Sequence, residues 1–106
     1  MQEVQEFLSE KEIKNKTNKK LVVLMIYKEN CPLCDQAYSW IDEFSKEFPN
    51  TKFAIINEKN LNQRDSCISP IGFPTFAVIK NNEILDTFYG KIKYDLVKKF
   101  ITTSAI

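Results

Sequence analysis

A Cys-x-x-Cys motif that follows directly on a continuous apolar run constrains this chain more than any other feature of its sequence. The run, Leu21–Tyr27, is rich in β-branched residues and is typical of a strand covered on both faces. The motif Cys31-Pro32-Leu33-Cys34 begins within four residues of it. Apolar residues then recur at helical spacing up to Pro49-Asn50, which predicts an amphipathic helix of about fourteen residues. The two cysteines are therefore expected at the start of a helix that follows a buried strand.

This placement favours thiol chemistry. At the N-cap of a helix, free backbone N–H groups and the helix dipole stabilise a thiolate, so Cys31 is the candidate nucleophile. Pro32 suits the first helical position, because its missing N–H has no partner within the helix there. The two intervening residues place Cys34 one turn from Cys31, close enough for a disulfide. We expect Cys31 to be the exposed nucleophile and Cys34 the recessed, resolving thiol.

The remaining hydrophobic patterns predict an α/β domain. Strand, helix and strand follow one another between residues 21 and 57, which predicts a parallel pair. Two further strands joined at Asn81-Asn82 predict a hairpin. The result is one domain, residues 1–106, with a mixed sheet of about four to five strands and helices on both faces. The expected elements are a helix at 4–13, strands at 21–27, 52–57, 74–80 and 83–89, the helix after the cysteine motif, a short helix at about 60–67, and a terminal helix with apolar positions 96, 97, 100 and 101.

Composition argues against several classes of function. Lys and Arg number 15 against 14 Asp and Glu, and a net charge of +1 gives no basic surface for nucleic acid or anionic membranes. Histidine is absent from the sequence, which excludes histidine general bases and histidine metal ligands. The longest apolar run, seven residues, is too short to span a bilayer. Because the N-terminus is polar and unlike a signal peptide, we expect a cytoplasmic protein.

Other interpretations of the cysteines stay open at this stage. A Cys-x-x-Cys pair can be half of a zinc site, but zinc takes four ligands, and only Cys67 and a carboxylate could complete the set. The pair could also be purely structural, although a permanent disulfide is unusual in a cytosolic chain. Cys67 is either a small, semi-buried apolar residue or a third redox thiol. We expect no metal and no bound cofactor.

The sequence resembles the thioredoxin family over nearly its whole length. The resemblance rests on the apolar strand that leads into the cysteine motif, on Gly72-Phe73-Pro74-Thr75, on Lys80-Asn81-Asn82-Glu83 and on Gly90. It implies a thioredoxin fold and thiol-disulfide exchange, in which Cys31 attacks and Cys34 resolves the mixed disulfide.

The resemblance also has implications for binding. Pro74 would be a cis-proline that faces the two cysteines. Pro32, Leu33, Phe73 and Pro74 would bind substrates. The partners implied are protein disulfides as substrates, with a reductase or a low-molecular-weight thiol that regenerates the reduced form. The protein is expected to be a monomer.

The chain departs from the family pattern beneath the cysteines. The family typically has a buried aspartate six residues before the first cysteine and a lysine beside it on the neighbouring strand. Those positions are Met25 and Ile55 here. Because both residues are apolar, the core contains no orphan charge there, but the usual proton acceptor for Cys34 is missing. We therefore expect resolution of the mixed disulfide to be slow at neutral pH and to rise with pH.

Two further departures concern the rim of the site. Asn30 stands where the family usually has tryptophan, which weakens the apolar platform beside Cys31. Pro32-Leu33 places proline first, as glutaredoxins do. The alternatives to a reductase are therefore a glutaredoxin-like or oxidising variant, or a non-catalytic binding module with the same fold.

Overall fold

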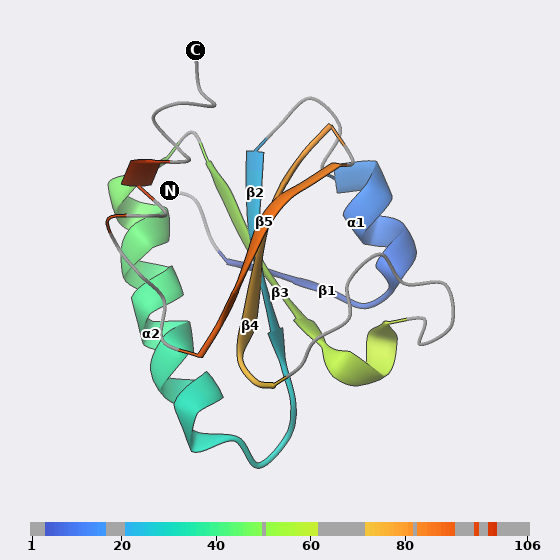
Figure 1. The fold of residues 1–106 in the computed structure, drawn as a ribbon, viewed down its shortest axis with the longest axis vertical. Coiled ribbons are helices and arrows are strands. Elements are labelled where there is room, and N and C mark those ends of the chain that lie inside the picture. Colours follow the sequence, from blue (N-terminus) through green and yellow to red (C-terminus); the bar gives the residue numbers. More distant parts are fainter. Residues whose placement is uncertain are drawn as a thin grey trace.

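The structure, a computed structural model, describes residues 4–16, 21–49, 51–61, 72–81 and 83–90, together with residues 95, 98 and 99. Within these residues a five-stranded sheet has the order β1-β3-β2-β4-β5 (Figure 1). Helix α2 covers one face of this sheet and helix α1 the other. The predicted mixed sheet between helices is thus confirmed. In chain order the elements are β1 (Gln5–Phe7), α1 (Glu10–Lys16), β2 (Leu21–Tyr27), α2 (Pro32–Glu47), β3 (Lys52–Asn57), the 3-10 turn η1 (Glu58–Asn60), β4 (Thr75–Lys80) and β5 (Glu83–Tyr89).

Strand β2 is at the centre of the sheet. It pairs in parallel with β3, where Met25 is opposite Ile55, and antiparallel with β4, where Ile26 is opposite Thr75. Strand β1 adds to β3 in parallel, and β5 forms the predicted hairpin with β4. Because β2 is hydrogen-bonded along both edges and covered on both faces, residues 21–26 are at most 8% exposed. This burial explains why its sequence is apolar without alternation.

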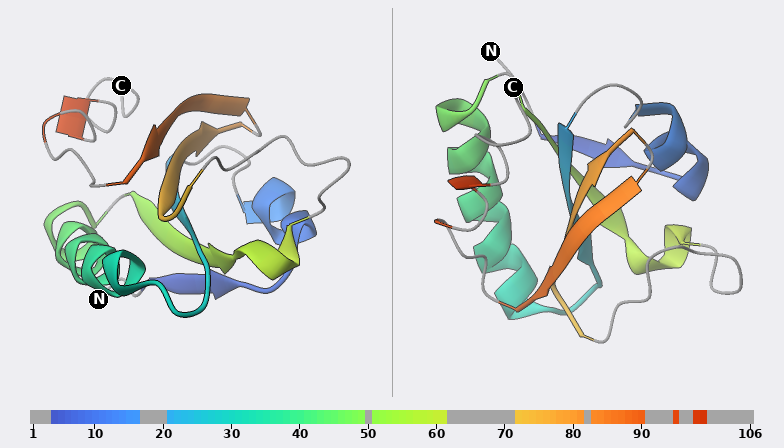
Figure 2. Two further views of the ribbon diagram at one scale, coloured as in Figure 1. Left: turned by 60° about the horizontal axis from the view of Figure 1, so that its bottom comes forward. Right: turned by 45° about the horizontal axis from the view of Figure 1, so that its top comes forward.

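Figure 2 shows the sheet between helix α2 on one side and helix α1 on the other. Because side chains alternate along each strand, the core has two layers, one on each face of the sheet. On one face Ala37, Ile41 and Phe44 of α2 pack against the strands, and the strand residues of this layer are Leu21, Val23, Met25, Phe53, Phe76 and Val78. On the other face Ile13 of α1 packs in a layer whose strand residues are Phe7, Val22, Leu24, Ile26, Ala54, Ile56, Ala77 and Ile79.

The prediction of one helix at 4–13 is wrong. Residues 5–7 form an edge strand, and α1 begins only at Glu10. Phe7 is fully buried opposite Ile56, and parallel pairing with β3 satisfies the backbone that a helix would have satisfied internally. Leu8, which the helical pattern counted as apolar face, is 68% exposed. The backbone N–H of Leu8 donates to the Glu12 carboxylate, where the chain turns into α1.

The other predicted elements agree with the structure where it describes them. Strands 21–27, 52–57 and 83–89 have the predicted bounds. The strand predicted at 74–80 is β4, which begins at Thr75, one residue later than predicted. Helix α2 has 16 residues and starts at Pro32. The short helix expected near 60–67 falls mostly on residues 62–71, which lie outside the described part of the chain, so it stays a prediction. The described residues before it form the turn η1. The expected terminal helix also lies mostly outside it. None of the described helices is long and apolar enough to cross a membrane.

A side-chain hydrogen bond ties the edge strand β1 to the end of β2. The Tyr27 hydroxyl donates to the Glu6 carboxylate, and this bond passes over β3, which lies between the two strands. The hydrogen bond to Glu6, followed by burial and by the negative charge of Glu6, raises the pKa of Tyr27 above its ordinary value. The folded state therefore favours the neutral hydroxyl.

We expect Tyr27→Phe to lower the free energy of unfolding by about 1 kcal/mol at neutral pH, because this hydrogen bond is lost. A pKa raised in the folded state stabilises the protein fully below the ordinary tyrosine value of about 10, and the contribution is lost as the pH rises through the folded value. The difference in the free energy of unfolding between the parent and Tyr27→Phe, measured by urea unfolding, should therefore shrink above about pH 10. Tyr38→Phe, at a position 42% exposed on α2, is the matched control and should change little. An equal loss in both variants would contradict the assignment.

Candidate active site

The first turn of α2 is built around Cys31. This residue is the N-cap, with extended φ and ψ of −121° and 96°, and Pro32 follows as the first helical residue. The Cys31 carbonyl accepts hydrogen bonds from the N–H groups of Cys34 at 3.0 Å and Asp35 at 3.2 Å. The Cys31 sulfur accepts a further hydrogen bond from the Cys34 N–H at 3.2 Å. The helix terminus thus directs a backbone donor at Cys31 Sγ, as the sequence predicts.

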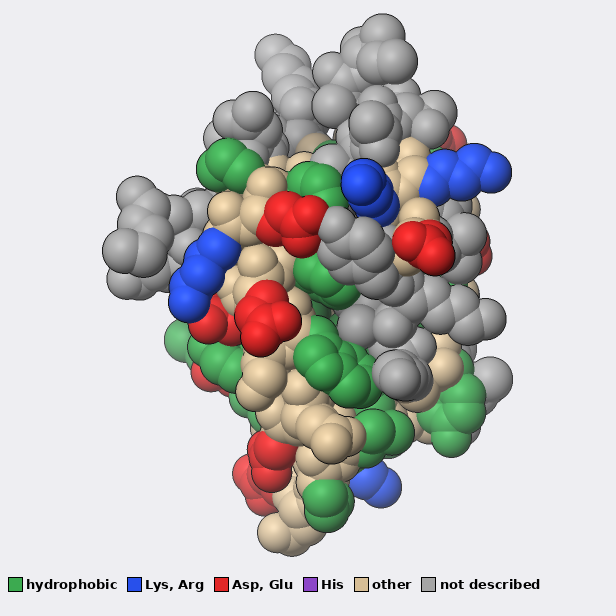
Figure 3. All heavy atoms as spheres, turned by 90° about the vertical axis from the view of Figure 1, so that its left-hand side faces the viewer, with side chains coloured by type: hydrophobic (Ala, Val, Ile, Leu, Met, Phe, Trp, Pro, Cys, Tyr) green, Lys and Arg blue, Asp and Glu red, His purple; other side chains and the backbone are tan. Residues whose placement is uncertain are grey.

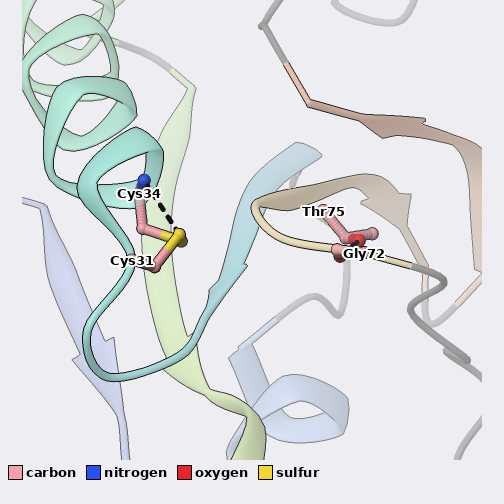
Figure 4. The surroundings of a disulfide bond; sticks show 4 residues. All are labelled: Cys31, Cys34, Gly72 and Thr75. Carbon is pink, nitrogen blue, oxygen red and sulfur yellow. Dashed lines mark hydrogen bonds between the residues drawn. A yellow bond between two sulfur atoms is a disulfide. The ribbon is translucent and has the colours of Figure 1, made fainter.

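Cys31 and Cys34 form a disulfide, and their Cα atoms are 5.2 Å apart (Figure 4). Both are buried, with 8% of Cys31 and 3% of Cys34 exposed. The prediction of an exposed Cys31 is therefore wrong for the disulfide form, because the disulfide and the first turn of α2 bury both sulfur atoms. The structure therefore represents the oxidised state of the pair.

The segment 72–75 lies at the same end of the sheet as the cysteines (Figure 4). The Phe73–Pro74 peptide bond is cis, as the resemblance implies. Two hydrogen bonds hold this segment: Thr75 Oγ1 donates to the Gly72 carbonyl at 2.6 Å, and the Gly90 N–H donates to the Pro74 carbonyl at 2.9 Å. Since Thr75 is opposite Ile26, five residues before Cys31, strand pairing brings the two segments to one end of the sheet.

The predicted rim residues differ in how far they reach the surface. Leu33 is 39% exposed, Pro32 is exposed, Phe73 is half-buried and Pro74 is buried. Cys67 lies outside the described residues, so its predicted role is not tested. On the face that Figure 3 shows, apolar side chains lie down the middle, and charged side chains lie mostly beside and above them.

Tyr89 is a rim residue that the sequence analysis missed. Tyr89 is 60% exposed and is paired with Thr75 across the β4–β5 hairpin. Its ring occupies the space that the Cβ of any larger residue at position 72 would need. Gly72 therefore permits the close approach of the Tyr89 ring to the cis-proline segment. The strand pairing of β4 and β5 creates this contact between residues far apart in sequence, so no local pattern could have indicated it.

Below the cysteines the layer between α2 and the sheet is apolar. Met25 is 1% exposed and packs with Ala37, one turn beyond Cys34 on α2. Ile55 is the β3 partner of Met25 and packs against the same cluster. The positions that carry an aspartate and a lysine in the family are thus neighbours here too, but neither has an ionisable group.

Charged side chains surround the end of β2. Lys59 Nζ pairs with the Glu29 carboxylate at 3.0 Å, and Lys28 Nζ lies 5.4 Å from the centroid of the Phe73 ring. Among the described residues, which do not include Cys67, no three Cys, Asp or Glu side chains come together to hold a metal ion.

Residues 2–103 match the family model described as Thioredoxin. The chain belongs to the thioredoxin family. The fold agrees with solved thioredoxins: that of Malassezia sympodialis, Mala s 13, has a TM-score of 0.82 at 21% identity, with 100% of this chain and 94% of that chain covered. Thioredoxin from Trypanosoma brucei brucei also has a TM-score of 0.82 at 21% identity, covering 98% of this chain and 93% of that one.

A curated relative extends beyond the region that matches. The chloroplastic thioredoxin-like protein CDSP32 of Arabidopsis thaliana is 26% identical over 98 residues. The match covers 87% of this chain but 32% of that protein, so the chain spans about a third of the relative's length. Thioredoxin-family membership and the disulfide at the start of α2 together support thiol-disulfide oxidoreductase chemistry at Cys31 and Cys34.

Asn30 has a backbone role that the sequence analysis did not assign. Its φ is +58°, in the left-handed region, where asparagine is tolerated better than other residues with a side chain. The chain turns here between the end of β2 and the N-cap of α2. The asparagine that replaces the family's tryptophan thus fits the turn that delivers Cys31.

We expect Asn30→Ala to lower the free energy of unfolding of the oxidised protein by about 1 kcal/mol. Alanine keeps a Cβ in the left-handed region but lacks the short polar side chain with which asparagine can hydrogen-bond locally. Asn30→Gly should stay within a few tenths of a kcal/mol of the parent, since glycine adopts this conformation freely. Urea unfolding of both variants measures the difference. If the alanine variant were as stable as the glycine variant, the conformational role of Asn30 would be disproved.

Proposed function

We propose that this thioredoxin-family protein reduces protein disulfides by dithiol exchange. The observation that supports this most directly is the Cys31–Cys34 disulfide at the N-terminus of α2, at the same end of the sheet as the cis-proline segment. Cys31 is the nucleophile and Cys34 the resolving thiol. Leu33, Phe73 and the exposed Tyr89 supply apolar surface on which a substrate could dock.

The reaction has two exchange steps. The Cys31 thiolate attacks one sulfur of the substrate disulfide, the Cys31–substrate bond forms, and the other substrate sulfur leaves as a thiolate that takes up a proton. Cys34 then loses its proton and attacks Cys31 Sγ, which forms the Cys31–Cys34 bond and releases the second substrate thiol. The substrate gains two electrons and the cysteine pair loses them. A reductase or a low-molecular-weight thiol then restores the dithiol, and the protein acts as a monomer.

The reduction potential of the Cys31/Cys34 couple decides the direction of electron flow. The protein is equilibrated in graded thiol–disulfide buffers, free thiols are trapped, and they are counted by intact mass. We expect a two-thiol transition near about −270 mV, the range of thioredoxin reductants. A transition near about −120 mV would assign an oxidant instead. Absence of a paired transition would leave a binding module as the better explanation. The cytoplasmic location stays a prediction from the sequence.

The order of the two motif residues favours one alternative that can be tested separately. Pro32-Leu33 has the order found in glutaredoxins, so a glutathione-dependent variant is the second candidate. Insulin disulfide reduction with and without glutathione separates the two enzymes. Turnover that needs glutathione would support the second candidate.

The two cysteine variants should behave differently. Cys34→Ser should accumulate a mixed disulfide between Cys31 and an insulin chain, because the resolving thiol is missing. Cys31→Ser should form no such adduct and should lose insulin reduction entirely. Non-reducing gels and intact mass measure the adduct. If Cys31→Ser retained turnover, the assignment of the nucleophile would be wrong.

The apolar pair beneath the site should slow resolution at neutral pH. We expect Met25→Asp to speed the resolution step at neutral pH and to flatten its rise with pH, because a carboxylate can accept the Cys34 proton. Met25→Asn is the matched control: it introduces a polar group at the same site, 1% exposed, without a titratable one. Both variants should be less stable than the parent. Single-turnover rates across the pH range measure resolution, and identical profiles for the two variants would refute the idea.

A further inference from the structure

The cation closest to the cis-proline segment among the described contacts is Lys28. It is exposed, directly follows β2, and its Nζ lies 5.4 Å from the centroid of the Phe73 ring. Attraction between an ammonium group and an aromatic face favours this position over free rotation in solvent. Phe73 in turn precedes the cis peptide bond to Pro74. The ammonium group is therefore held at the edge of the surface where the proposed substrates dock.

The positive charge of Lys28 has no counter-charge within the described part of the chain. The adjacent carboxylate, Glu29, is paired with Lys59 at 3.0 Å, so it does not neutralise Lys28. Asp35 lies in the first turn of α2, and no ion pair joins it to Lys28 among the described residues. Among the described residues, the Lys28 ammonium beside Phe73 is thus not neutralised by an ion pair.

We propose that Lys28 is a specificity-determining residue that favours protein substrates with an acidic side chain next to the disulfide. This inference rests on the proposed reductase function. A substrate that docks over Phe73 brings the residues beside its cysteine close to the Lys28 ammonium. A carboxylate there neutralises the ammonium, whereas a lysine there is repelled. This charge complementarity mainly raises the rate at which substrate and protein associate, and the gain weakens as salt is added. Because the pair is exposed, the change in kcat/KM is a few-fold.

The test uses three disulfide-bonded peptides that differ only in the residue beside the attacked cysteine, which is Glu, Gln or Lys. For the parent protein we expect kcat/KM to be about threefold to fivefold higher for the Glu peptide than for the Lys peptide at low salt. The preference should fall toward one in high salt, because ions screen an exposed pair. Lys28→Gln should remove the preference, so that the Glu and Lys peptides react at similar rates.

Three further variants make the test specific. Lys28→Arg keeps the charge and should keep the preference, and Lys28→Glu should reverse it. Lys46→Gln removes the same charge from an exposed position in the last turn of α2, at the other end of this helix from the cysteines, and should leave the preference intact. Circular dichroism checks that each variant is folded.

The outcomes separate this proposal from the function on which it rests. If the parent protein uses all three peptides at equal rates, the role of Lys28 is overturned and the reductase function stands. If Lys28→Gln affects only the reduction of glutathione disulfide, the residue belongs to a glutathione site and the proposal is overturned. If no peptide is reduced, the proposed function fails, and this assignment fails with it.

Discussion

The burial of β2 at the centre of the sheet is the constraint on which the rest of the structure depends. Its residues 21–26 are nearly inaccessible to solvent, and fully burying each large apolar side chain contributes about 1.5–3 kcal/mol. Hydrogen bonding to β3 and β4 on either side fixes the position of the strand's carboxyl end. That end leads through Asn30 to Cys31, and its antiparallel partner β4 begins just after Pro74. One buried strand thus brings the thiol pair and the cis-proline segment to the same end of the sheet.

The apolar layer under α2 shows how stability and chemistry are connected in this protein. Met25 and Ile55 are opposite each other on adjacent strands and pack with Ala37. An ion pair buried at these positions would require desolvation of both charges, which well-packed apolar side chains avoid. With methionine and isoleucine at these two positions, neither side chain beneath Cys34 has an ionisable group. A more hydrophobic core at this point is therefore expected to come with a slower proton transfer.

The surface around the site is polar and charged where the family usually presents an aromatic platform. Asn30 occupies a left-handed turn position, Lys28 lies over the Phe73 ring, and Glu29 is paired with Lys59. Exposed apolar surface is retained in Leu33 and in the ring of Tyr89. These side chains lie around an N-capping cysteine with its partner one turn on, so we expect substrate preference to depend on the rim.

The sequence by itself determined the elements whose patterns are local. A continuous apolar run specified a buried strand, and Cys31-Pro32 specified a helix start, because capping and burial depend on neighbouring residues. Only the tertiary structure decided which segments meet. The short strand Gln5–Phe7 looked helical because Phe7 and Ile13 do share one core layer, but pairing with β3 stabilised it as an edge strand. The contact of Tyr89 with Gly72 arises because β4 pairs with β5. The position of Lys28 over Phe73 arises because β4 pairs with β2. Both contacts join residues that are about fifteen to fifty positions apart in the sequence. No local sequence pattern encodes such contacts, since they depend on strand pairing and packing across the whole domain.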